Sequence, residues 1–400
     1  MHIVVLGGGI SGITTATLLQ ARGHRTTLLT SSTPHQQHGA DYLRFASLYP
    51  AASVIPHTVH VKNEARHTRW SQQLFDVFCG RPGWGVRIQR HAELFETPPP
   101  RPDYLDALRR LTLLPEDGRG RPGLPQRGKA SGLYGWLFDM TFVEAPTYMR
   151  KLYALYNELG GCVQRQHLTR DRCSEWPGDL WVNCLGYAAP HLFEDKAPAT
   201  YRHGHLLHVR PPASGTTWRK ASPIASYNYE PASHVYPAPG STPGGIYFYP
   251  RQSVWVVGGT KHPANEHGAY TAPLREPTVR VHGVVIPKAM WDLNAALISS
   301  MTGADIRSLP VRVVSGLRYV RDPDGKGVRL SWEDTGGRPV VHNYGHGGAG
   351  VTLSWSAALH VARTIEAKSK SPTLRCLSHP IAGTLCNASQ KLLEEAPASE

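Results

Sequence analysis

The apolar residues at the start of the chain change their spacing within thirty positions. Residues 3–6 form a continuous apolar run, which is typical of a buried strand, and residues 13–21 carry apolar side chains at helical intervals. A glycine-rich segment lies between them, and residues 25–29 form a second strand-like run. The pattern therefore predicts a strand, a tight turn, a helix and another strand.

The turn between the first strand and the helix reads Gly7-Gly-Gly-Ile-Ser-Gly12, with the G-x-G-x-x-G spacing of dinucleotide-binding turns. Gly7 would allow the turn, Gly9 would let the main chain approach a pyrophosphate, and Gly12 would permit close packing of the helix. The free amides at the start of the helix, at Ile10 and Ser11, would face the phosphates. A glycine-rich turn that binds nothing is the alternative, and the strand and helix around it argue against that.

The second predicted strand ends in Thr30-Ser31-Ser32, where dinucleotide folds usually place an Asp or Glu for the ribose hydroxyls. A hydroxyl at Thr30 or Ser31 can still hydrogen-bond a ribose, but without a charge. The sequence has no nearby Arg cluster for a 2′-phosphate, so NADP is not favoured.

A second glycine-rich segment, residues 342–350, lies near the other end of the chain. Its glycines, at positions 345, 347, 348 and 350, leave main-chain amides uncovered, and a helical pattern begins at Val351. Bare amides beside the N-terminus of a helix favour the binding of an anion or an electron-rich ring. We therefore expect the two distant turns to belong to one site.

The sequence His342-Asn-Tyr-Gly-His-Gly-Gly-Ala-Gly350, followed by Thr352, Trp355 and Ala357, resembles the signature of the D-amino-acid oxidase family of flavoproteins. The resemblance spans residues 1–366, and it continues through segments 51–58, 181–186, 246–250, 257–261 and 316–321. Several of these segments are similar to the D-aspartate oxidase branch. The resemblance implies FAD as the cofactor.

The distribution of these segments predicts an α/β protein in which a Rossmann-like FAD-binding domain is discontinuous. The expected FAD-binding domain comprises residues 1–60, 142–200 and 308–370. A substrate domain with a mixed or antiparallel sheet is expected from residues 61–141 and 201–307, with a basic Gly/Pro-rich surface loop at 115–131. The polar tail, residues 371–400, is predicted to be disordered.

The resemblance also implies roles for individual residues. Arg321 matches the arginine that grips the substrate carboxylate, and Tyr247 matches the tyrosine that assists it; the carbonyl of Gly348 would accept a hydrogen bond from the substrate amine. Alternatively, Arg321 belongs to a surface turn with the neighbouring Asp322, and Tyr247 only fills its strand. Lys261 stands where the aspartate-preferring relatives have a basic residue, so it would pair with a second carboxylate; alternatively, it is simply solvated. Arg251 departs from the small residue that the family has after Pro250, and it would add charge and bulk near the mouth of the site.

The residues predicted to bind FAD are Gly7, Gly9, Ile10, Ser11, Gly12, Thr30, Ser31, Ala52, Ser53, Leu168, Gly186, Arg318, Gly347, Gly348, Gly350, Val351 and Thr352. Thr352 would donate a hydrogen bond to the flavin ring, and Arg318 would either orient the ring or serve only in packing.

The expected reaction is FAD-dependent oxidative deamination of a D-amino acid, D-aspartate or D-glutamate being favoured. A hydride would pass from Cα to flavin N5, the imine would hydrolyse to a 2-oxo acid and ammonia, and O2 would be reduced to H2O2. Ser53 and Ser356 replace glycines of the family, which leaves open a tailoring enzyme that oxidises a C–N bond in a larger natural product. A non-catalytic nucleotide-binding partner of a polyanion is the third alternative.

The chain has 43 Lys and Arg against 30 Asp and Glu, a net charge of +13, but the basic residues are dispersed and no nucleic-acid motif accompanies them. No partner of that kind is expected, and a homodimer is compatible with the sequence. Alternation along a strand places His203 and His205 on one face and His208 on the other, so no metal site is expected.

The sequence contains no apolar stretch long enough for a membrane span, no room for a signal peptide before the first strand and no C-terminal peroxisomal tripeptide. Its six cysteines lack a C-x-x-C pair, which favours free thiols in a reducing compartment. A cytoplasmic location is therefore expected.

Overall fold

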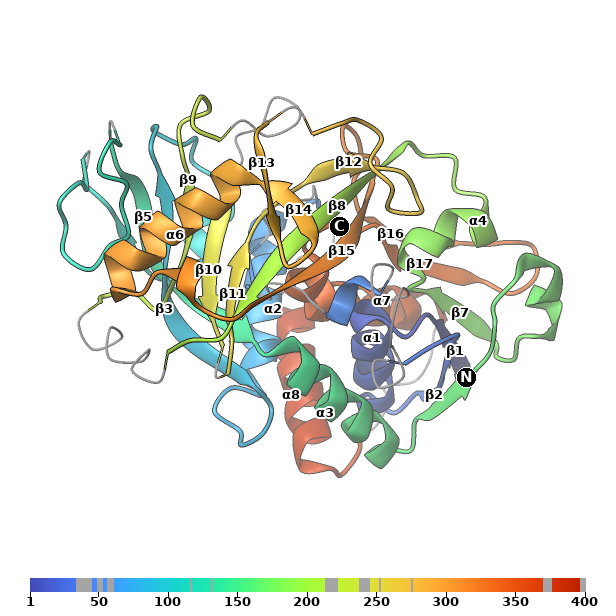
Figure 1. Ribbon diagram of the computed structural model, residues 1–400. Coiled ribbons are helices and arrows are strands. Elements are labelled where there is room, and N and C mark those ends of the chain that lie inside the picture. Colours follow the sequence, from blue (N-terminus) through green and yellow to red (C-terminus); the bar gives the residue numbers. More distant parts are fainter. Residues whose placement is uncertain are drawn as a thin grey trace. The chain divides into compact units, whose positions relative to one another are not determined.

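The structure is a computed structural model, in which residues 1–33, 45–48, 53–55, 61–115, 117–130, 132–212, 222–236, 245–251, 253–274, 276–369 and 376–395 are described. Two compact units make up the chain (Figure 1). The first contains Met1–Arg87, Thr141–Thr200 and Tyr319–Glu400, and the second contains Ile88–Met140 and Tyr201–Arg318.

The first unit is built on a six-stranded sheet with the order β16-β17-β7-β1-β2-β6. The strands are β1 (His2–Leu6), β2 (Arg25–Thr30), β6 (Cys162–Arg165), β7 (Leu180–Asn183), β16 (Arg329–Glu333) and β17 (Val340–Tyr344). All neighbours are parallel except β16 and β17. The apolar residues of β1 are fully buried, as expected for a parallel strand that is covered on both faces. The predicted Rossmann-like α/β fold is confirmed.

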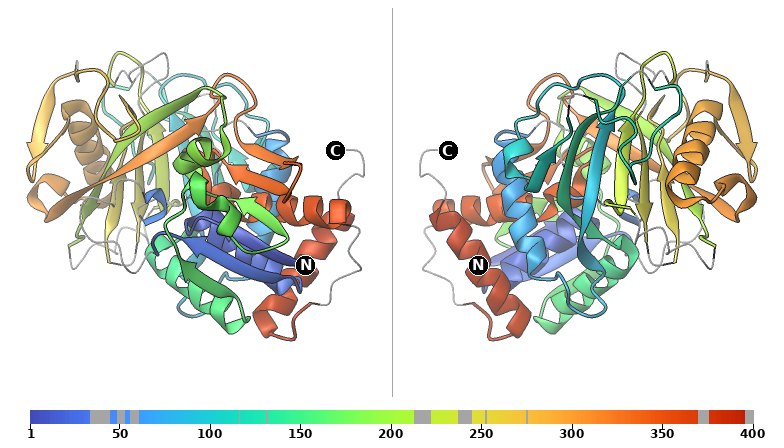
Figure 2. Two further views of the ribbon diagram at one scale, coloured as in Figure 1. Left: turned by 90° about the vertical axis from the view of Figure 1, so that its right-hand side faces the viewer. Right: turned by 90° about the vertical axis from the view of Figure 1, so that its left-hand side faces the viewer.

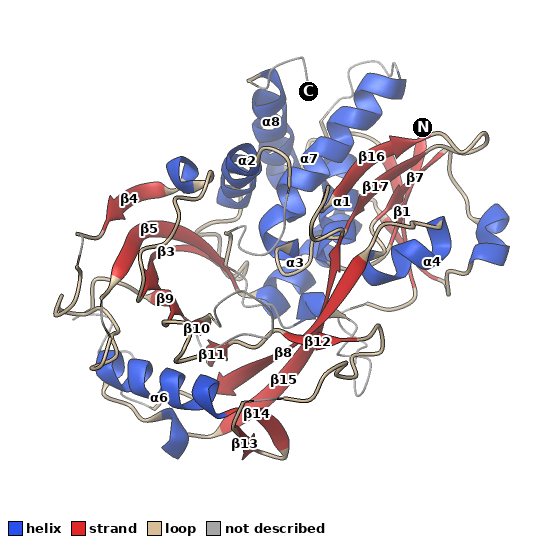
Figure 3. Ribbon diagram, turned by 90° about the horizontal axis from the view of Figure 1, so that it is seen from above, coloured by secondary structure: helices blue, strands red, loops and turns tan. Residues whose placement is uncertain are grey.

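The helices of the first unit are α1 (Ile10–Ala21), α2 (Glu64–Asp76), α3 (Ala145–Glu158), α4 (Ala189–Phe193), α7 (Gly350–Ser369) and α8 (Pro380–Glu394). Figure 3 shows α1, α2, α7 and α8 gathered in one group, and the contacts of α1 and α2 with α7 and α8 agree with this view. The central helix α1 is buried nearly all round, because other elements surround it.

The sequence assigns α2 to the second domain, but α2 packs in the first unit instead. Its residues Trp70, Leu74 and Phe75 are buried in the same core as Trp355 of α7, and the rings of Phe75 and Trp355 meet edge to face. Residues 308–318, expected in the FAD-binding domain, belong to the second unit.

The prediction of a disordered tail is wrong for the residues of α8. Ala382, Leu385 and Leu392 are buried, and their spacing gives the helix an apolar face that contacts α1. Arg22, directly after α1, binds Glu366 of α7 through two hydrogen bonds of 2.7 and 2.8 Å and donates another to Ser389 of α8. These contacts fix α8 to the first unit (Figure 2).

A disulfide joins Cys376 to Cys386, so the prediction of free thiols is wrong for this pair. Cys79, Cys162, Cys173 and Cys184 take no part in a disulfide. None of the described helices is both long enough and apolar enough to pass through a lipid bilayer.

The second unit contains a nine-stranded sheet with the order β12-β8-β11-β10-β9-β3-β5-β4, and β15 pairs with β8. The strands are β3 (Val86–Phe95), β4 (Arg109–Leu113), β5 (Tyr134–Val143), β8 (Ala199–Val209), β9 (Ser226–Glu230), β10 (Ile246–Pro250), β11 (Trp255–Gly258), β12 (His262–Ala264) and β15 (Val311–Arg321). The pair β3–β9 is parallel, whereas the pairs β8–β11, β10–β11 and β9–β10 are antiparallel. This is the mixed sheet that the sequence predicts.

Helix α6 (Lys288–Thr302) packs on this sheet through Met290, Leu293 and Leu297, and the hairpin of β13 (Thr278–Val281) and β14 (Val284–Pro287) contacts the helix. Short 3-10 helices lie at η2 (Ala46–Leu48), η3 (Leu105–Ala107), η4 (Arg170–Glu175), η5 (Gly186–Ala188) and η6 (Ile306–Ser308).

The basic loop at 115–131 is less solvated than its composition indicates. Leu124 is buried in the core of the second unit, and Arg127 binds the buried Glu96 through hydrogen bonds of 2.9 and 2.7 Å. Tyr229 donates to the same carboxylate at 2.8 Å. Part of the loop's positive charge is therefore neutralised by an ion pair that anchors it.

Candidate active site

The first glycine turn follows β1, and its glycines are required by close approaches of the main chain. Gly7 has φ +105°, a conformation that L side chains rarely adopt. A Cβ atom on Gly12 would lie 1.8 Å from the carbonyl oxygen of Gly7, so only glycine lets α1 pack against the turn. A Cβ on Gly9 would meet only the Ser47 side chain, at 3.3 Å.

The N-terminus of α1 is not capped by a side chain, and its first turn has no acidic residue. The amide of Ile10 donates to Ser47 Oγ at 2.9 Å, and Ser11 Oγ lies 3.3 Å from His346 Nδ1 in the second glycine turn. The partial positive charge of the helix end is therefore not neutralised locally, which suits a phosphate group.

Four neighbouring parallel strands of the first unit end in turns that the sequence predicts to bind FAD. Gly7 follows β1, Ser31 follows β2, Gly186 follows β7, and Gly345 comes directly after β17. Because these strands are adjacent and parallel, their carboxyl ends lie at one edge of the sheet. Gly186, with φ +60°, has no atom within 4 Å of where its Cβ would be. This edge, where four adjacent parallel strands end in such turns, fits a bound dinucleotide.

Thr30 has a different role from the one predicted. It is buried, and its hydroxyl donates to the carbonyl oxygen of Ser32 at 2.7 Å, so it closes the turn after β2. Ser31 is exposed and remains the candidate for a hydrogen bond to the ribose.

Thr352 also bonds within the protein. Its buried hydroxyl lies 3.0 Å from the carbonyl oxygens of Ser53 and Ile55 and accepts a hydrogen bond from the Ile55 amide at 3.1 Å. The predicted donation to the flavin ring is not supported, because a hydroxyl has one proton. Thr352 instead ties the segment next to Ala52 to α7, and Ala52 itself lies outside the described residues.

The other residues of the second glycine turn occupy different environments. Gly347 has φ +52°, and its amide donates to the carbonyl oxygen of Tyr319 at 3.1 Å. Gly348 is exposed, Gly350 begins α7, and Val351 is buried. The carbonyl of Gly348 as acceptor for the substrate amine stays a prediction.

Leu168 and Ser53 are in the first unit, as a nucleotide role requires. Leu168 is partly buried against the cluster that includes Val4 and Leu29, and Ser53 forms a β-bridge with Phe142. Two contacts of the first turn were missed by the sequence reasoning: the Ser47 hydroxyl at the Ile10 amide, and the Tyr153 hydroxyl, which donates to Gly8 O at 2.7 Å. No local sequence signal marks either residue.

In the second unit, Tyr247 and Arg318 form a pair. The Tyr247 ring covers Gly258 and Gly259, where a Cβ would come within 2.2 and 2.5 Å of the ring. Burial raises the pKa of Tyr247, although the nearby positive charge of Arg318 and a hydrogen bond from it lower that pKa. The phenol is therefore neutral at physiological pH, with a proton to donate.

Arg318 lies over Gly204 and donates from Nη1 to the carbonyl oxygen of Thr260 at 3.0 Å. A Cβ on Gly204 would be 2.1 Å from Nη1, so the absence of a side chain there makes room for the guanidinium. The guanidinium and the phenol of Tyr247 are hydrogen-bond donors of the kinds that bind a carboxylate.

Lys261 is exposed to solvent. Desolvation of its ammonium group and the charges of Arg318 and Arg202 lower its pKa to about 8, against the opposing charge of Glu230. Arg251 is buried and not at a solvent-exposed mouth, in contrast to the prediction, and its charge acts on Tyr247 and His208.

The contacts of Arg321 do not support its predicted role as the carboxylate clamp, nor the alternative of a surface turn. Arg321 is buried, its Nε and Nη2 donate to Asp195 at 2.6 and 3.3 Å, and Nη1 donates to Gly327 O at 3.0 Å. Tyr344 donates to the same carboxylate at 2.6 Å. Arg318 and Arg321 are three residues apart on β15, so they point to opposite faces of the strand.

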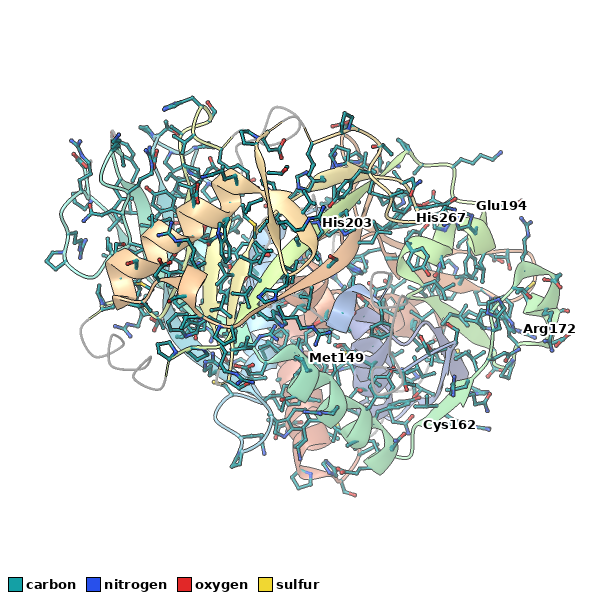
Figure 4. The ribbon with its side chains drawn as sticks, in the orientation of Figure 1. Met149, Cys162, Arg172, Glu194, His203 and His267 are labelled. Atoms are coloured by element: carbon teal, nitrogen blue, oxygen red, sulfur yellow. A yellow bond between two sulfur atoms is a disulfide. The ribbon has the colours of Figure 1, made fainter. Side chains whose placement is uncertain are left out.

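The histidines of β8 are held by hydrogen bonds to the protein. His203 Nδ1 lies 2.7 Å from Gly268 O (Figure 4), and His205 Nδ1 lies 2.8 Å from Ser315 Oγ while Nε2 contacts the Tyr270 hydroxyl. Among the described residues, no group of three or more His, Cys, Asp or Glu is arranged to hold a metal ion.

Substitution of Gly12 by alanine is expected to remove most of the bound FAD, because the new Cβ would overlap the Gly7 carbonyl oxygen and open the turn. The FAD content per chain after gel filtration measures this. Gly383→Ala in α8 is the control, since its Cβ would lie 3.9 Å from the nearest atom, Leu377 O. Full FAD occupancy in Gly12→Ala would contradict the assignment of this turn.

Comparison with known proteins agrees with this cofactor site. The model of the DAO family, described as FAD dependent oxidoreductase, matches residues 2–364. The chain is 29% identical to a D-amino-acid oxidase of Rubrobacter xylanophilus, over 90% of this chain and 94% of the relative. It is 30% identical to a D-amino-acid oxidase of Streptomyces coelicolor, over 90% and 96%. The glycine oxidase of Geobacillus kaustophilus shares the fold, with a TM-score of 0.60 and 16% identity over 94% and 98% of the two chains.

The chain therefore belongs to the DAO family, and it is an FAD-dependent oxidoreductase.

Proposed function

We propose that the protein oxidises the Cα–N bond of a D-amino acid. The substrate loses a hydride from Cα and a proton from nitrogen, and water hydrolyses the resulting imine to a 2-oxo acid and ammonia. O2 takes up the two electrons and two protons and becomes H2O2. The pairing of Arg318 with Tyr247 carries this proposal, and the two D-amino-acid oxidases of similar sequence support it.

The carboxylate of the substrate is bound by Arg318 and Tyr247. Arg318 spends Nη1 on the Thr260 carbonyl, whereas each of the three nitrogens of the Arg321 guanidinium donates to Asp195 or Gly327. The guanidinium donates one hydrogen bond to each carboxylate oxygen, and the neutral phenol of Tyr247 donates to one of them as well. Fixing the carboxylate fixes Cα, which is what hydride transfer requires.

FAD, when bound, supplies the group that accepts the hydride from Cα. The chain's part is to hold the isoalloxazine through the glycine turns of the first unit and to orient the amino acid. The carbonyl of the exposed Gly348 is proposed to accept a hydrogen bond from the substrate's amino group.

Lys261 favours an acidic side chain on the substrate, because it is close enough to Arg318 for the charge of that arginine to lower its pKa. A second carboxylate of a substrate bound to Arg318 would therefore be near the ammonium group. Lys261→Met is expected to raise KM for D-aspartate about 10–100-fold, the effect of losing a hydrogen bond between charged groups, and to change KM for D-alanine little. Lys261→Arg keeps the charge and serves as the control. An equal effect on both substrates would show that Lys261 does not recognise the charge of the substrate's side chain.

The pKa of about 8 gives the same proposal a pH signature. Lys261 is cationic below this pH and neutral above it, so the preference for D-aspartate over D-alanine is expected to decline as the pH rises through about 8. The ratio of the two kcat/KM values against pH measures this, with Lys261→Arg holding the ratio to higher pH.

The experiment that tests the proposed function is an oxygen-uptake assay of the FAD-loaded protein with a panel of D- and L-amino acids. The proposal predicts H2O2, ammonia and a 2-oxo acid in equal amounts from a D-amino acid. Oxidation of L-amino acids alone, or of amines without a carboxylate, would overturn it.

A further inference from the structure

Beside Tyr247, the sheet of the second unit carries a row of polar residues on three adjacent strands. In the strand register, Tyr247 of β10 pairs with Asn228 of β9, and Asn228 pairs with Glu93 of β3. Glu93 is 3% exposed, and His91, two positions earlier on the same strand, is fully buried. An acidic side chain and a histidine thus lie inside the unit, close to the residue proposed to bind the substrate.

The hydrogen bonds of this row converge on the Glu93 carboxylate. The Tyr249 hydroxyl donates to Asn228 Oδ1, and Asn228 Nδ2 donates to Glu93 Oε1 at 2.7 Å. From the other side, His91 Nε2 lies 3.0 Å from the same oxygen. A carboxylate only accepts, so an ionised Glu93 sets the direction of every donor in the row and the orientation of the Asn228 amide.

A second set of hydrogen bonds extends the row from His91 and keeps the same direction from donor to acceptor. His91 Nδ1 lies 2.8 Å from Ser226 Oγ, and Gln89 Nε2 donates to Ser226 Oγ at 2.8 Å. If His91 donates from Nε2, Nδ1 accepts the hydroxyl proton of Ser226, and Ser226 in turn accepts from Gln89. The donor and acceptor capacities match at each step, as a buried polar network needs.

These bonds hold the Tyr249 ring between two others. The rings of His91 and Tyr249 are stacked with centroids 5.8 Å apart, and the centroids of Tyr249 and Tyr247 are 5.2 Å apart. Tyr247 therefore has Gly258 and Gly259 beneath its ring, Tyr249 beside it and Arg318 at its hydroxyl. A shift of Tyr249 would move the hydroxyl of Tyr247 relative to the guanidinium.

A buried carboxylate is costly to desolvate, and apolar residues of the same volume would stabilise the sheet as well or better. A role in positioning Tyr247 explains why polar residues occupy these buried positions. We propose that Glu93, Asn228 and Tyr249 are positioning residues that fix the Tyr247 phenol for the carboxylate of the substrate. This inference rests on the proposed function, since the carboxylate is that of the amino acid.

Tyr249→Phe tests the proposal, because it keeps the ring and removes only the hydroxyl that reaches Asn228. The matched control is Tyr229→Phe, on the same strand as Asn228 but on the opposite face, where a buried phenol also donates to a buried carboxylate, Glu96. Glu93→Gln and Glu96→Gln form a second matched pair.

We expect Tyr249→Phe to raise KM for the D-amino acid, and Kd for the corresponding 2-oxo acid followed by the flavin spectrum, about fivefold, the effect of one hydrogen bond. Tyr229→Phe should leave both within about twofold, although the two variants lower Tm by similar amounts. Because the residues act as one chain, Glu93→Gln/Tyr249→Phe should be no worse than the more damaging single variant.

Equal KM and Kd in Tyr249→Phe and Tyr229→Phe would overturn the inference, as would additive effects in the double variant. The 2-oxo acid titration does not depend on turnover. A wild-type protein that binds the 2-oxo acid but oxidises no D-amino acid would refute the proposed function while the titration of the variants still decides the inference. A wild-type protein that binds no carboxylate would overturn the inference itself.

Discussion

Arg318→Ala is expected to lower kcat/KM for the D-amino acid about 10²–10⁴-fold while FAD stays bound. The variant loses two charge-assisted hydrogen bonds to the substrate carboxylate, each worth about 1.5–3 kcal/mol, and a tenfold change in affinity corresponds to about 1.4 kcal/mol. Steady-state kinetics and the FAD content of the purified variant measure the two effects separately.

Arg312→Ala is the control for this prediction, since Arg312 lies on the same strand, β15, and is exposed. It should leave kcat/KM within about twofold, as surface substitutions usually do. If Arg318→Ala kept the wild-type kcat/KM, the carboxylate clamp would have to be sought elsewhere, and the proposed reaction would lose its main support.

Arg321→Ala is expected to act on stability instead of on catalysis. Removing one partner of a buried ion pair leaves Asp195 uncompensated, at a cost of about 3–5 kcal/mol in the free energy of unfolding. Thermal or urea unfolding of the variant measures this, and KM of the folded fraction should stay near wild type. The exposed pair of Arg172 and Glu175 gives the control, because Arg172→Ala should leave the free energy of unfolding nearly unchanged.

The same ion pair gives an acid limit to stability. Burial alone would raise the pKa of Asp195, but hydrogen bonds from Arg321 and Tyr344 outweigh it and lower the pKa to about 2. Since the pKa is lower in the folded state, the stabilisation is present above about pH 4, the unfolded value, and is lost as the pH falls towards 2. Arg321→Ala should lose this part of the pH dependence of stability. A variant with a lowered kcat/KM and wild-type stability would instead show that Arg321 binds the substrate.

The sequence predicts the parts of the fold that depend on local pattern. The apolar runs of β1 and β2 and the glycines at positions 7, 12 and 345 specify strands and turns within a few residues, and the structure has them. Helix α8 was missed because its apolar positions lie in a polar segment, and they become a core face only where α1 is there to cover them.

The choice between Arg318 and Arg321 needed the structure. Both arginines lie in one motif, and the sequence does not say which face of β15 each takes. Asp195, which binds Arg321, is distant in the sequence, as is Thr260, which accepts from Arg318. The hydroxyls of Thr30 and Thr352 were likewise assigned to the cofactor because their main-chain acceptors could not be foreseen.

The most direct test of the account is anaerobic titration of the FAD-loaded protein with D-aspartate, D-glutamate and D-alanine, each beside its L-enantiomer. The account predicts that a D-amino acid bleaches the visible flavin absorbance, with the acidic ones acting at the lowest concentrations, and that admitting air restores the absorbance with release of H2O2. Flavin that stays oxidised with every D-amino acid would contradict it.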